Sequence, residues 1–270
     1  MENQDTFQPE QPTNEIEELS HTDKIVGVIS EPSNLFSKLS FLSMKATDWL
    51  LPLLLLIIVA IVSTFIYMSN PEIKLEMQQQ QEKAMREQFQ KMVESGQMTQ
   101  QQVDEQLDKT AEMMNNPMII YLIPSISIFV IMLLWFFIFT TIAFLISKFA
   151  FKGDGSYSQA MTAMGLPMYI SVLQSIILVI VGLLMGKMLT GLNPASLTGM
   201  DIKTLPGFLL SRLDVFSIWF YIVVGIAFAK MFKSDNVKKY IFTSIGFWLV
   251  FMFIIFGLSK VSPMFGNMIR

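Results

Sequence analysis

Five separate apolar stretches, each long enough to cross a lipid bilayer, constrain this chain more than any other feature. The first, residues 49–68, contains thirteen Leu, Ile, Val or Phe residues and no charged residue. On an insertion scale, these side chains contribute about 4 to 8 kcal/mol towards membrane insertion. About 20 residues are enough to cross a hydrocarbon core about 30 Å thick. The sequence therefore predicts an integral membrane protein.

The other four stretches, predicted as further transmembrane helices, are residues 118–147, 165–189, 213–232 and 240–258. The stretch 118–147 is so long that it must tilt, kink near Pro124 or extend beyond the lipid. The stretch 213–232 is the weakest, because Asp214 and Lys230 leave only fifteen uncharged residues between them. We predict an all-α fold, a polytopic membrane helix bundle with five transmembrane helices. A bundle with four is the alternative.

The N-terminal region predicts a tail followed by short helices. Residues 1–22 are rich in Glu, Gln and Pro, which is typical of a disordered segment. Residues 23–48 predict cytoplasmic amphipathic helices, the first capped by Asp23. The apolar face of the second consists of Leu35, Phe36, Leu39 and Leu42. This face either positions the first span or binds a partner. At the other end, residues 259–270 predict a short C-terminal tail.

Between the first two spans, residues 72–114 predict a helical hairpin. The segment 70–117 holds eleven Gln, nine acidic and five basic residues, and few of its residues are β-branched, which favours helix. Gly96 ends one helix and Thr99 begins the next. An apolar stripe on the second helix comprises Val103, Leu107 and Ala111. This stripe either packs inside the hairpin, which is then a spacer, or docks a partner as a coiled coil.

Residues that carry chemistry are scarce. The chain has no Cys, and its single His, His21, lies in the polar tail. We therefore predict no catalytic, cofactor-binding or metal site and no enzyme activity, and the net charge of -3 argues against nucleic acid as a partner. An ionisable residue within a span marks function by default. The candidate intramembrane polar site comprises Asp214, Gln174, Ser171 and Ser175. The alternative is that Asp214 is an interfacial carboxylate that fixes the depth of its helix.

The charges around the spans indicate an orientation. By raw count, Lys and Arg are almost equal on the two sides, nine against ten. Four lysines crowd one short connection, however: Lys230, Lys233, Lys238 and Lys239. Because short cytoplasmic loops are enriched in Lys and Arg, this density favours a cytoplasmic N-terminus and a C-terminus outside.

Three segments, in this order, resemble the Yip1 domain family. They are 29–36 (Ile-Ser-Glu-Pro-Ser-Asn-Leu-Phe), 153–160 (Gly-Asp-Gly-Ser-Tyr-Ser-Gln-Ala) followed by Pro167, and 213–219 (Leu-Asp-Val-Phe-Ser-Ile-Trp) running to Gly225. The likeness covers residues 24–258. It implies a five-helix membrane domain with a cytoplasmic N-terminus. Eukaryotic members act in vesicle traffic with Rab-type GTPases and carry an Asp-Leu-Tyr-Gly-Pro segment that this chain lacks. The resemblance is therefore to the prokaryotic branch, and Rab-type binding is not expected.

From these observations we expect a non-enzymatic scaffold or organiser in a bacterial cytoplasmic membrane. Its expected partners are the lipid bilayer and other membrane proteins, or further copies of the chain. The alternative is a small transporter or channel subunit for a neutral or lipid-like substrate, with Asp214, Gln174, Ser171 and Ser175 lining the path.

Overall fold

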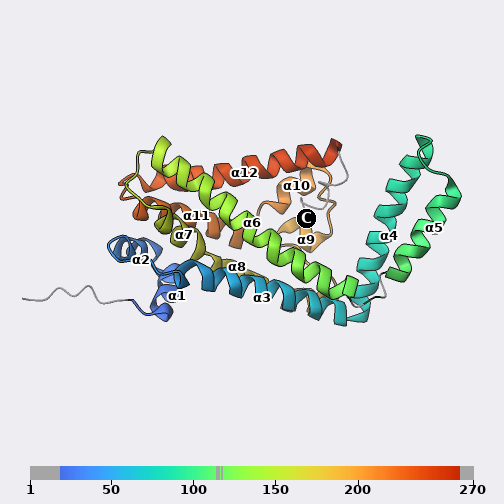
Figure 1. Ribbon diagram of the computed structural model, residues 1–270, viewed down its shortest axis with the longest axis horizontal. Coiled ribbons are helices and arrows are strands. Elements are labelled where there is room, and N and C mark those ends of the chain that lie inside the picture. The colour runs from blue at the N-terminus through green and yellow to red at the C-terminus, as the bar shows by residue number, and fades with distance from the viewer. Residues whose placement is uncertain (1–18, 114–115, 117, 262–270) are drawn as a thin grey trace, which may run out of the picture.

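The chain is all-α in the computed structural model, which describes residues 19–113, 116 and 118–261 (Figure 1). No β-strand occurs among these residues. The predicted fold class, a polytopic helix bundle with a hairpin inserted between its first two spans, is confirmed. Two predicted tails fall partly outside the described residues. For the N-terminal tail, 1–22, this applies to residues 1–18. For the C-terminal tail, 259–270, it applies to residues 262–270.

Four helical segments are long and apolar enough to cross a membrane, and a bent pair of helices makes five if it counts as one span. The four continuous spans are α3 (Thr47–Ser69), the segment Met118–Ala150, the consecutive helices α7 (Tyr157–Gly165) and α8 (Met168–Met185), and α12 (Val237–Val261). The bent pair, which is fourth in chain order, consists of α10 (Leu205–Ser211) and α11 (Val215–Met231), which meet at 59°. The predicted fourth span, 213–232, is thus a shorter helix preceded by a bend.

The second span is longer than a bilayer is thick. It comprises η1 (Met118–Leu122), α6 (Ile123–Leu145) and η2 (Ile146–Ala150). At 1.5 Å per residue, its 33 residues extend about 50 Å, against a hydrocarbon core of about 30 Å. For this length the sequence predicts a tilt, a kink near Pro124 or an extension beyond the lipid, and in Figure 1 α6 crosses the bundle diagonally. Pro124, which has no N–H to donate, lies where the π-helical turn η1 passes into α6.

The N-terminal helices α1 (His21–Ser30) and α2 (Pro32–Leu39) pack against the end of the bundle. The cap of α1 is Ser20, and Asp23 completes the capping box three residues later, so the predicted cap at Asp23 is wrong by one turn. Helix α2 ends at Leu39, before the predicted end of the amphipathic segment. Its apolar face packs on α11, with Phe36 fully buried and Leu39 1% exposed. Burial in the protein core, and not the membrane surface, therefore explains this amphipathic pattern.

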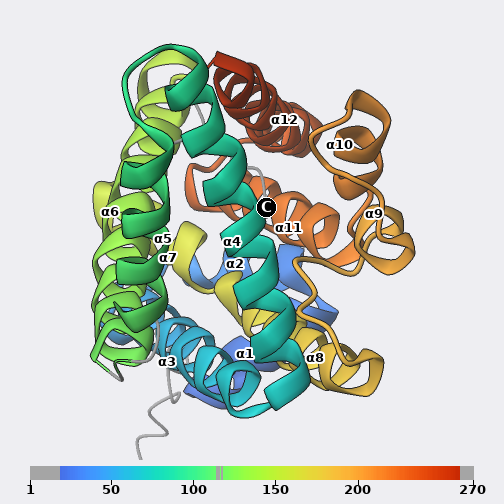
Figure 2. The ribbon, with the colours of Figure 1, turned by 90° about the vertical axis from the view of Figure 1, so that its right-hand side faces the viewer.

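The hairpin consists of α4 (Pro71–Glu94) and α5 (Gln100–Met113) and projects from one end of the bundle (Figures 1 and 2). Gly96 has φ +72° in the connection, a left-handed conformation that favours glycine. At the base, Ile73 of α4 is fully buried against Tyr67 and Val179. This small apolar cluster ties the hairpin to α3 and α8.

Between α8 and α11 the chain forms two short helices. They are α9 (Pro194–Thr198), capped by Asn193, and α10, capped by Thr204. Beyond them, α11 and α12 pack closely, because Gly225 lets the Ile241 backbone approach: a Cβ at Gly225 would lie 2.5 Å from the Ile241 Cα. These contacts hold α11, the second helix of the bent pair, against α12.

Candidate intramembrane polar site

Asp214 is the centre of a polar cluster inside the bundle. The residue is 3% exposed and caps α11, with Oδ1 accepting a hydrogen bond from the Ser217 N–H at 3.0 Å. The same oxygen accepts from Gln174 Nε2 at 3.0 Å, and Oδ2 accepts from the Leu192 N–H at 2.7 Å. Three segments distant in sequence therefore meet at one carboxylate. These bonds offset the cost of burying its charge.

The cluster lies beside the interior of the neighbouring helix α8, away from its C-terminal end. Gln174 is eleven residues before Met185, the last residue of α8, and so about 16 Å from that end along the helix axis. Asp214 reaches this level because the chain after α8 returns into the bundle through α10 before α11 begins. The carboxylate is thus buried beside the middle of α8, which an interfacial anchor would not be.

The chain approaches the carboxylate closely at Gly191. A Cβ there would lie 2.9 Å from Asp214 Oδ2 and 2.4 Å from Asn193 Nδ2. Asn193 is itself 4% exposed, and its Oδ1 accepts from the Ser196 N–H to cap α9. The absence of a side chain at Gly191 therefore lets the connection fold over Asp214.

A polar cavity of about 290 Å³, here called the polar pocket, adjoins the cluster. Its polar lining comprises Ser171, Gln174, Asn193, Ser211, Arg212 and Asp214, with further residues from α11 and α12. Three of the four predicted polar residues, Ser171, Gln174 and Asp214, thus come together. The fourth, Ser175, donates to the Ser171 carbonyl within α8 and is not among the lining residues.

Arg212 supplies a positive charge to the polar pocket, and the sequence reasoning did not select it. Its Nε and Nη2 donate to Ser211 Oγ at 3.0 and 2.9 Å, and its Cζ lies 5.1 Å from the centre of the Phe208 ring. Phe208 is fully buried. The sequence signal was the Arg-Leu-Asp order at the start of the weakest span, which places both charges at the bend.

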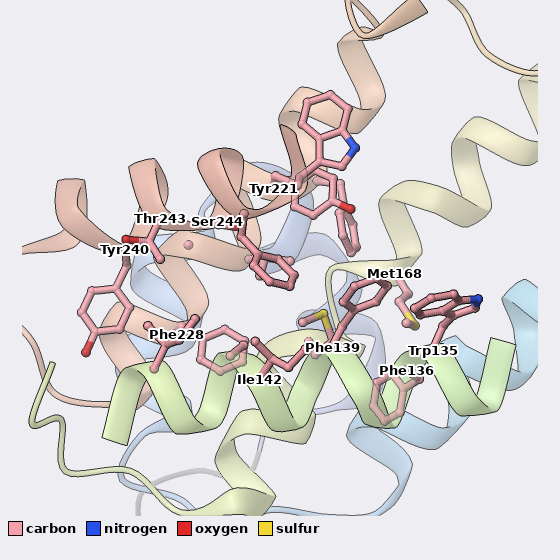
Figure 3. Close-up of a pocket in the computed structure, with 18 of the residues that line it drawn as sticks. Trp135, Phe136, Phe139, Ile142, Met168, Tyr221, Phe228, Tyr240, Thr243 and Ser244 are labelled. Carbon is pink, nitrogen blue, oxygen red and sulfur yellow. The ribbon is translucent and has the colours of Figure 1, made fainter. Parts of the chain in front are cut away.

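A second cavity, here called the apolar pocket, has a volume of about 280 Å³ and lies among α3, α6, α8, α11 and α12. In Figure 3, Phe139 and Ile142 of α6 lie on one side, and Thr243 and Ser244 of α12 on the other. The residues that line it include no charged side chain. It shares Ser171, Phe220, Tyr221 and Trp248 with the polar pocket. The two cavities therefore adjoin.

A second polar cluster, at the other end of the bundle, was not predicted. Lys24 Nζ of α1 lies 2.6 Å from Asp48 Oδ1 in the first turn of α3, and the two side chains are 7% and 1% exposed. Nearby, His21 Nε2 and the Tyr169 hydroxyl are 2.5 Å apart. Burial lowers the pKa of His21; the Asp48 carboxylate opposes this and the Lys24 ammonium adds to it. The cluster joins α1 to α3 and α8.

The predicted partner-contact residues are mostly covered. Leu35, Phe36 and Leu39 are buried, and Leu42 packs on the same core. On the hairpin, Val103 and Leu107 are 4% and 7% exposed, and the side chain of Ala111 lies outside the described residues. None of the six described side chains offers an open apolar surface, because helix packing within this chain already uses it. Any contact with a partner must therefore involve other faces.

Comparison with models of protein families matches residues 26–258 to the Yip1 domain. No curated protein and no solved structure matched in the corresponding searches. In the part of the chain that the structure describes, no group of three or more His, Cys, Asp and Glu residues could hold a metal ion.

Proposed function

This multi-pass membrane protein belongs to the Yip1 domain family, and we propose that it is a non-enzymatic scaffold whose α4–α5 hairpin docks a partner. The observation that carries the proposal is the projection of the hairpin away from the bundle, where its outer faces are free of the spans (Figures 1 and 2). Its apolar stripe packs between α4 and α5, so the docking surface is the polar exterior.

The exterior of the hairpin is acidic. The segment 70–117 carries nine acidic residues against five basic ones. Among them, Glu87, Glu94 and Asp104 are exposed. Since complementary charge steers association and selects partners, we propose a partner surface rich in Lys and Arg. It belongs to another membrane protein or to the soluble part of one.

We propose a bacterial cytoplasmic membrane, with the N-terminus inside and the hairpin outside. Four lysines, Lys230, Lys233, Lys238 and Lys239, lie in or next to the short connection between α11 and α12, which supports this orientation. The chain has no Cys, so single cysteines can report it. A membrane-impermeant maleimide added to spheroplasts should label Gln97→Cys in the hairpin connection and not Asn236→Cys. The reverse pattern would invert the topology.

Charge reversal tests the docking role. The triple variant Glu87→Lys, Glu94→Lys and Asp104→Lys should abolish co-purification of the partner from native membranes. The matched neutral variant, with Gln at the first two positions and Asn at the third, should weaken it less. A partner retained equally by all three proteins would reject the acidic surface as its docking site. Circular dichroism of the purified variants verifies that the hairpin remains helical.

Transport of a neutral or lipid-like substrate is the second candidate function, and the polar pocket inside the bundle favours it. Asp214→Asn and Gln174→Leu change the hydrogen bonding of that pocket and leave the hairpin unchanged. If these variants show reduced substrate flux into liposomes and still recover the partner, transport is supported. Partner recovery lost only on hairpin charge reversal would support the scaffold.

A further inference from the structure

We propose that the bundle binds one glycerophospholipid, with an acyl chain in the apolar pocket and the phosphate beside Arg212 in the polar pocket. This site is separate from the hairpin and does not depend on the scaffold role. The inference rests on the continuity of the two pockets, their order along the helices and the Arg212 guanidinium in the polar pocket.

The two pockets form one amphipathic site. They share Ser171, Phe220, Tyr221 and Trp248. The Tyr221 and Trp248 rings stack with their centroids 4.9 Å apart at this junction. Each pocket is close to the lower end of the roughly 300–1,000 Å³ usual for small-molecule sites, and together they fall within it. A ligand that fills both must be apolar at one end and polar at the other.

The order of the pockets sets the direction of the bound lipid. Along α11, the polar pocket spans 214–221 and the apolar pocket 220–228. Along α12, which runs the other way, the apolar pocket spans 240–251 and the polar pocket 248–252. The polar pocket is therefore nearer the α9–α10 end, and the apolar pocket extends towards the α1–α2 end. A bound lipid therefore lies along the bundle, with its head beside the middle of α8 and its chain towards the α1–α2 end.

The head-group chemistry follows from the two charged residues of the polar pocket. The Asp214 carboxylate already accepts from Gln174, Leu192 and Ser217. Arg212 presents a guanidinium fixed by Ser211 and by the Phe208 ring. Because a guanidinium matches the geometry of phosphate oxygens, the phosphodiester lies at Arg212. The side chains of Ser171 and Asn193 supply polar groups for the rest of the head.

An acyl chain can reach the apolar pocket between α6 and α12. Their side chains meet across this gap through aromatic contacts. Phe139 lies 5.8 Å from Phe247 and 5.2 Å from Phe251, and Trp135 lies 5.5 Å from Phe251, between ring centroids. Rotation of these side chains, without separation of packed backbones, would admit a chain from the surrounding bilayer.

Native mass spectrometry of the full-length protein tests the proposal. The detergent-solubilised protein is incubated with dioleoylphosphatidylglycerol or with dioleoylglycerol, which has the same chains and no phosphate. We expect one bound phospholipid and at least about tenfold weaker binding of dioleoylglycerol, since charge-assisted hydrogen bonds to the phosphate are lost. Glycerol phosphate should not displace the phospholipid, because it lacks the chains.

Four variants locate the site. Arg212→Gln removes the charge, and Ser244→Phe fills the apolar pocket that Ser244 lines. Ser127→Phe is the matched control, because Ser127 is an exposed residue of α6 outside both pockets. The first two should reduce binding at least about tenfold, and the control should bind as the unaltered protein does. Arg212→Lys keeps the charge and should retain part of the affinity.

The contrary results are distinct. Unchanged binding in Arg212→Gln and Ser244→Phe would mean non-specific annular lipid, and equal loss in Ser127→Phe would show that the losses do not come from the two pockets. Equal binding of dioleoylglycerol would overturn phosphate recognition. A protein that carries no lipid, or a second copy of the chain in place of lipid, would reject the site. If Arg212→Gln does not fold, Ser244→Phe and the two lipids still decide the outcome.

Discussion

The buried ion pair between Lys24 and Asp48 makes a quantitative prediction. The two side chains are 7% and 1% exposed and 2.6 Å apart, and Asp48 Oδ2 also accepts from the Lys45 N–H at 3.3 Å. Removing one partner leaves the other charge buried without compensation, which costs about 3–5 kcal/mol. We therefore expect Lys24→Met and Asp48→Asn each to lower the free energy of unfolding by about that amount.

The double variant separates charge from packing. With both charges removed, no uncompensated ion remains, and Asn at position 48 keeps an acceptor for the Lys45 N–H. We expect the double variant to be more stable than the sum of the single losses predicts, by about 2–3 kcal/mol.

Equilibrium unfolding in mixed micelles, with SDS as the denaturant, measures all four proteins. Each protein is monitored by far-ultraviolet circular dichroism and by Trp fluorescence. Single variants within about 0.5 kcal/mol of the unaltered protein would show that the pair is not buried in the folded state. Strict additivity in the double variant would show that the two side chains do not interact. Either result would refute the reasoning.

Three further predictions use the same stability measurement. Gly225→Ala should destabilise by about 1–3 kcal/mol, because its Cβ would lie 2.5 Å from the Ile241 Cα. Gly246→Ala, where no atom lies within 4 Å, should be neutral or stabilising; equal losses would contradict the close packing of α11 on α12. Burial lowers the pKa of His21, so the unfolded chain binds more protons than the folded chain as the pH falls. The free energy of unfolding should therefore decline as the pH falls through about 6.5. His21→Gln should remove that part of the pH dependence, and an unchanged profile would exclude His21 as its source. Asp214→Ala should cost about 2 kcal/mol or more, because α11 loses its cap and buried donors lose their acceptor, whereas Asp214→Asn should cost less; equal costs would exclude the acceptor role.

The spans and the hairpin were predictable because their signals are local. A continuous apolar run identifies a span, and Gly96 followed by Thr99 marks a helix boundary in the residues themselves. The length of the second span, which exceeds the thickness of the lipid, was likewise evident from the sequence. No tertiary information was needed for these features.

The bend between α10 and α11 and the burial of α2 depend on tertiary contacts. An amphipathic pattern such as that of Leu35, Phe36 and Leu39 predicts an apolar neighbour and does not say whether this is lipid or α11. In the same way, nothing local in the sequence pairs Lys24 with Asp48, because their contact depends on how α1 folds back towards the start of α3. The sequence singled out Asp214 and Gln174 one by one, each from its own segment. Their meeting required the return of the chain through α10.

The central claim is that the acidic hairpin docks a membrane partner, and site-specific photo-crosslinking in native membranes tests it most directly. A photoreactive residue replaces Gln88 or Gln101, both exposed on the hairpin, or Phe242, which is 73% exposed on α12 and serves as the control. The account predicts one reproducible protein adduct from the two hairpin positions, absent from Phe242 and lost when Glu87, Glu94 and Asp104 are reversed to Lys. Adducts that are the same from all three positions, or that survive the charge reversal, would contradict it.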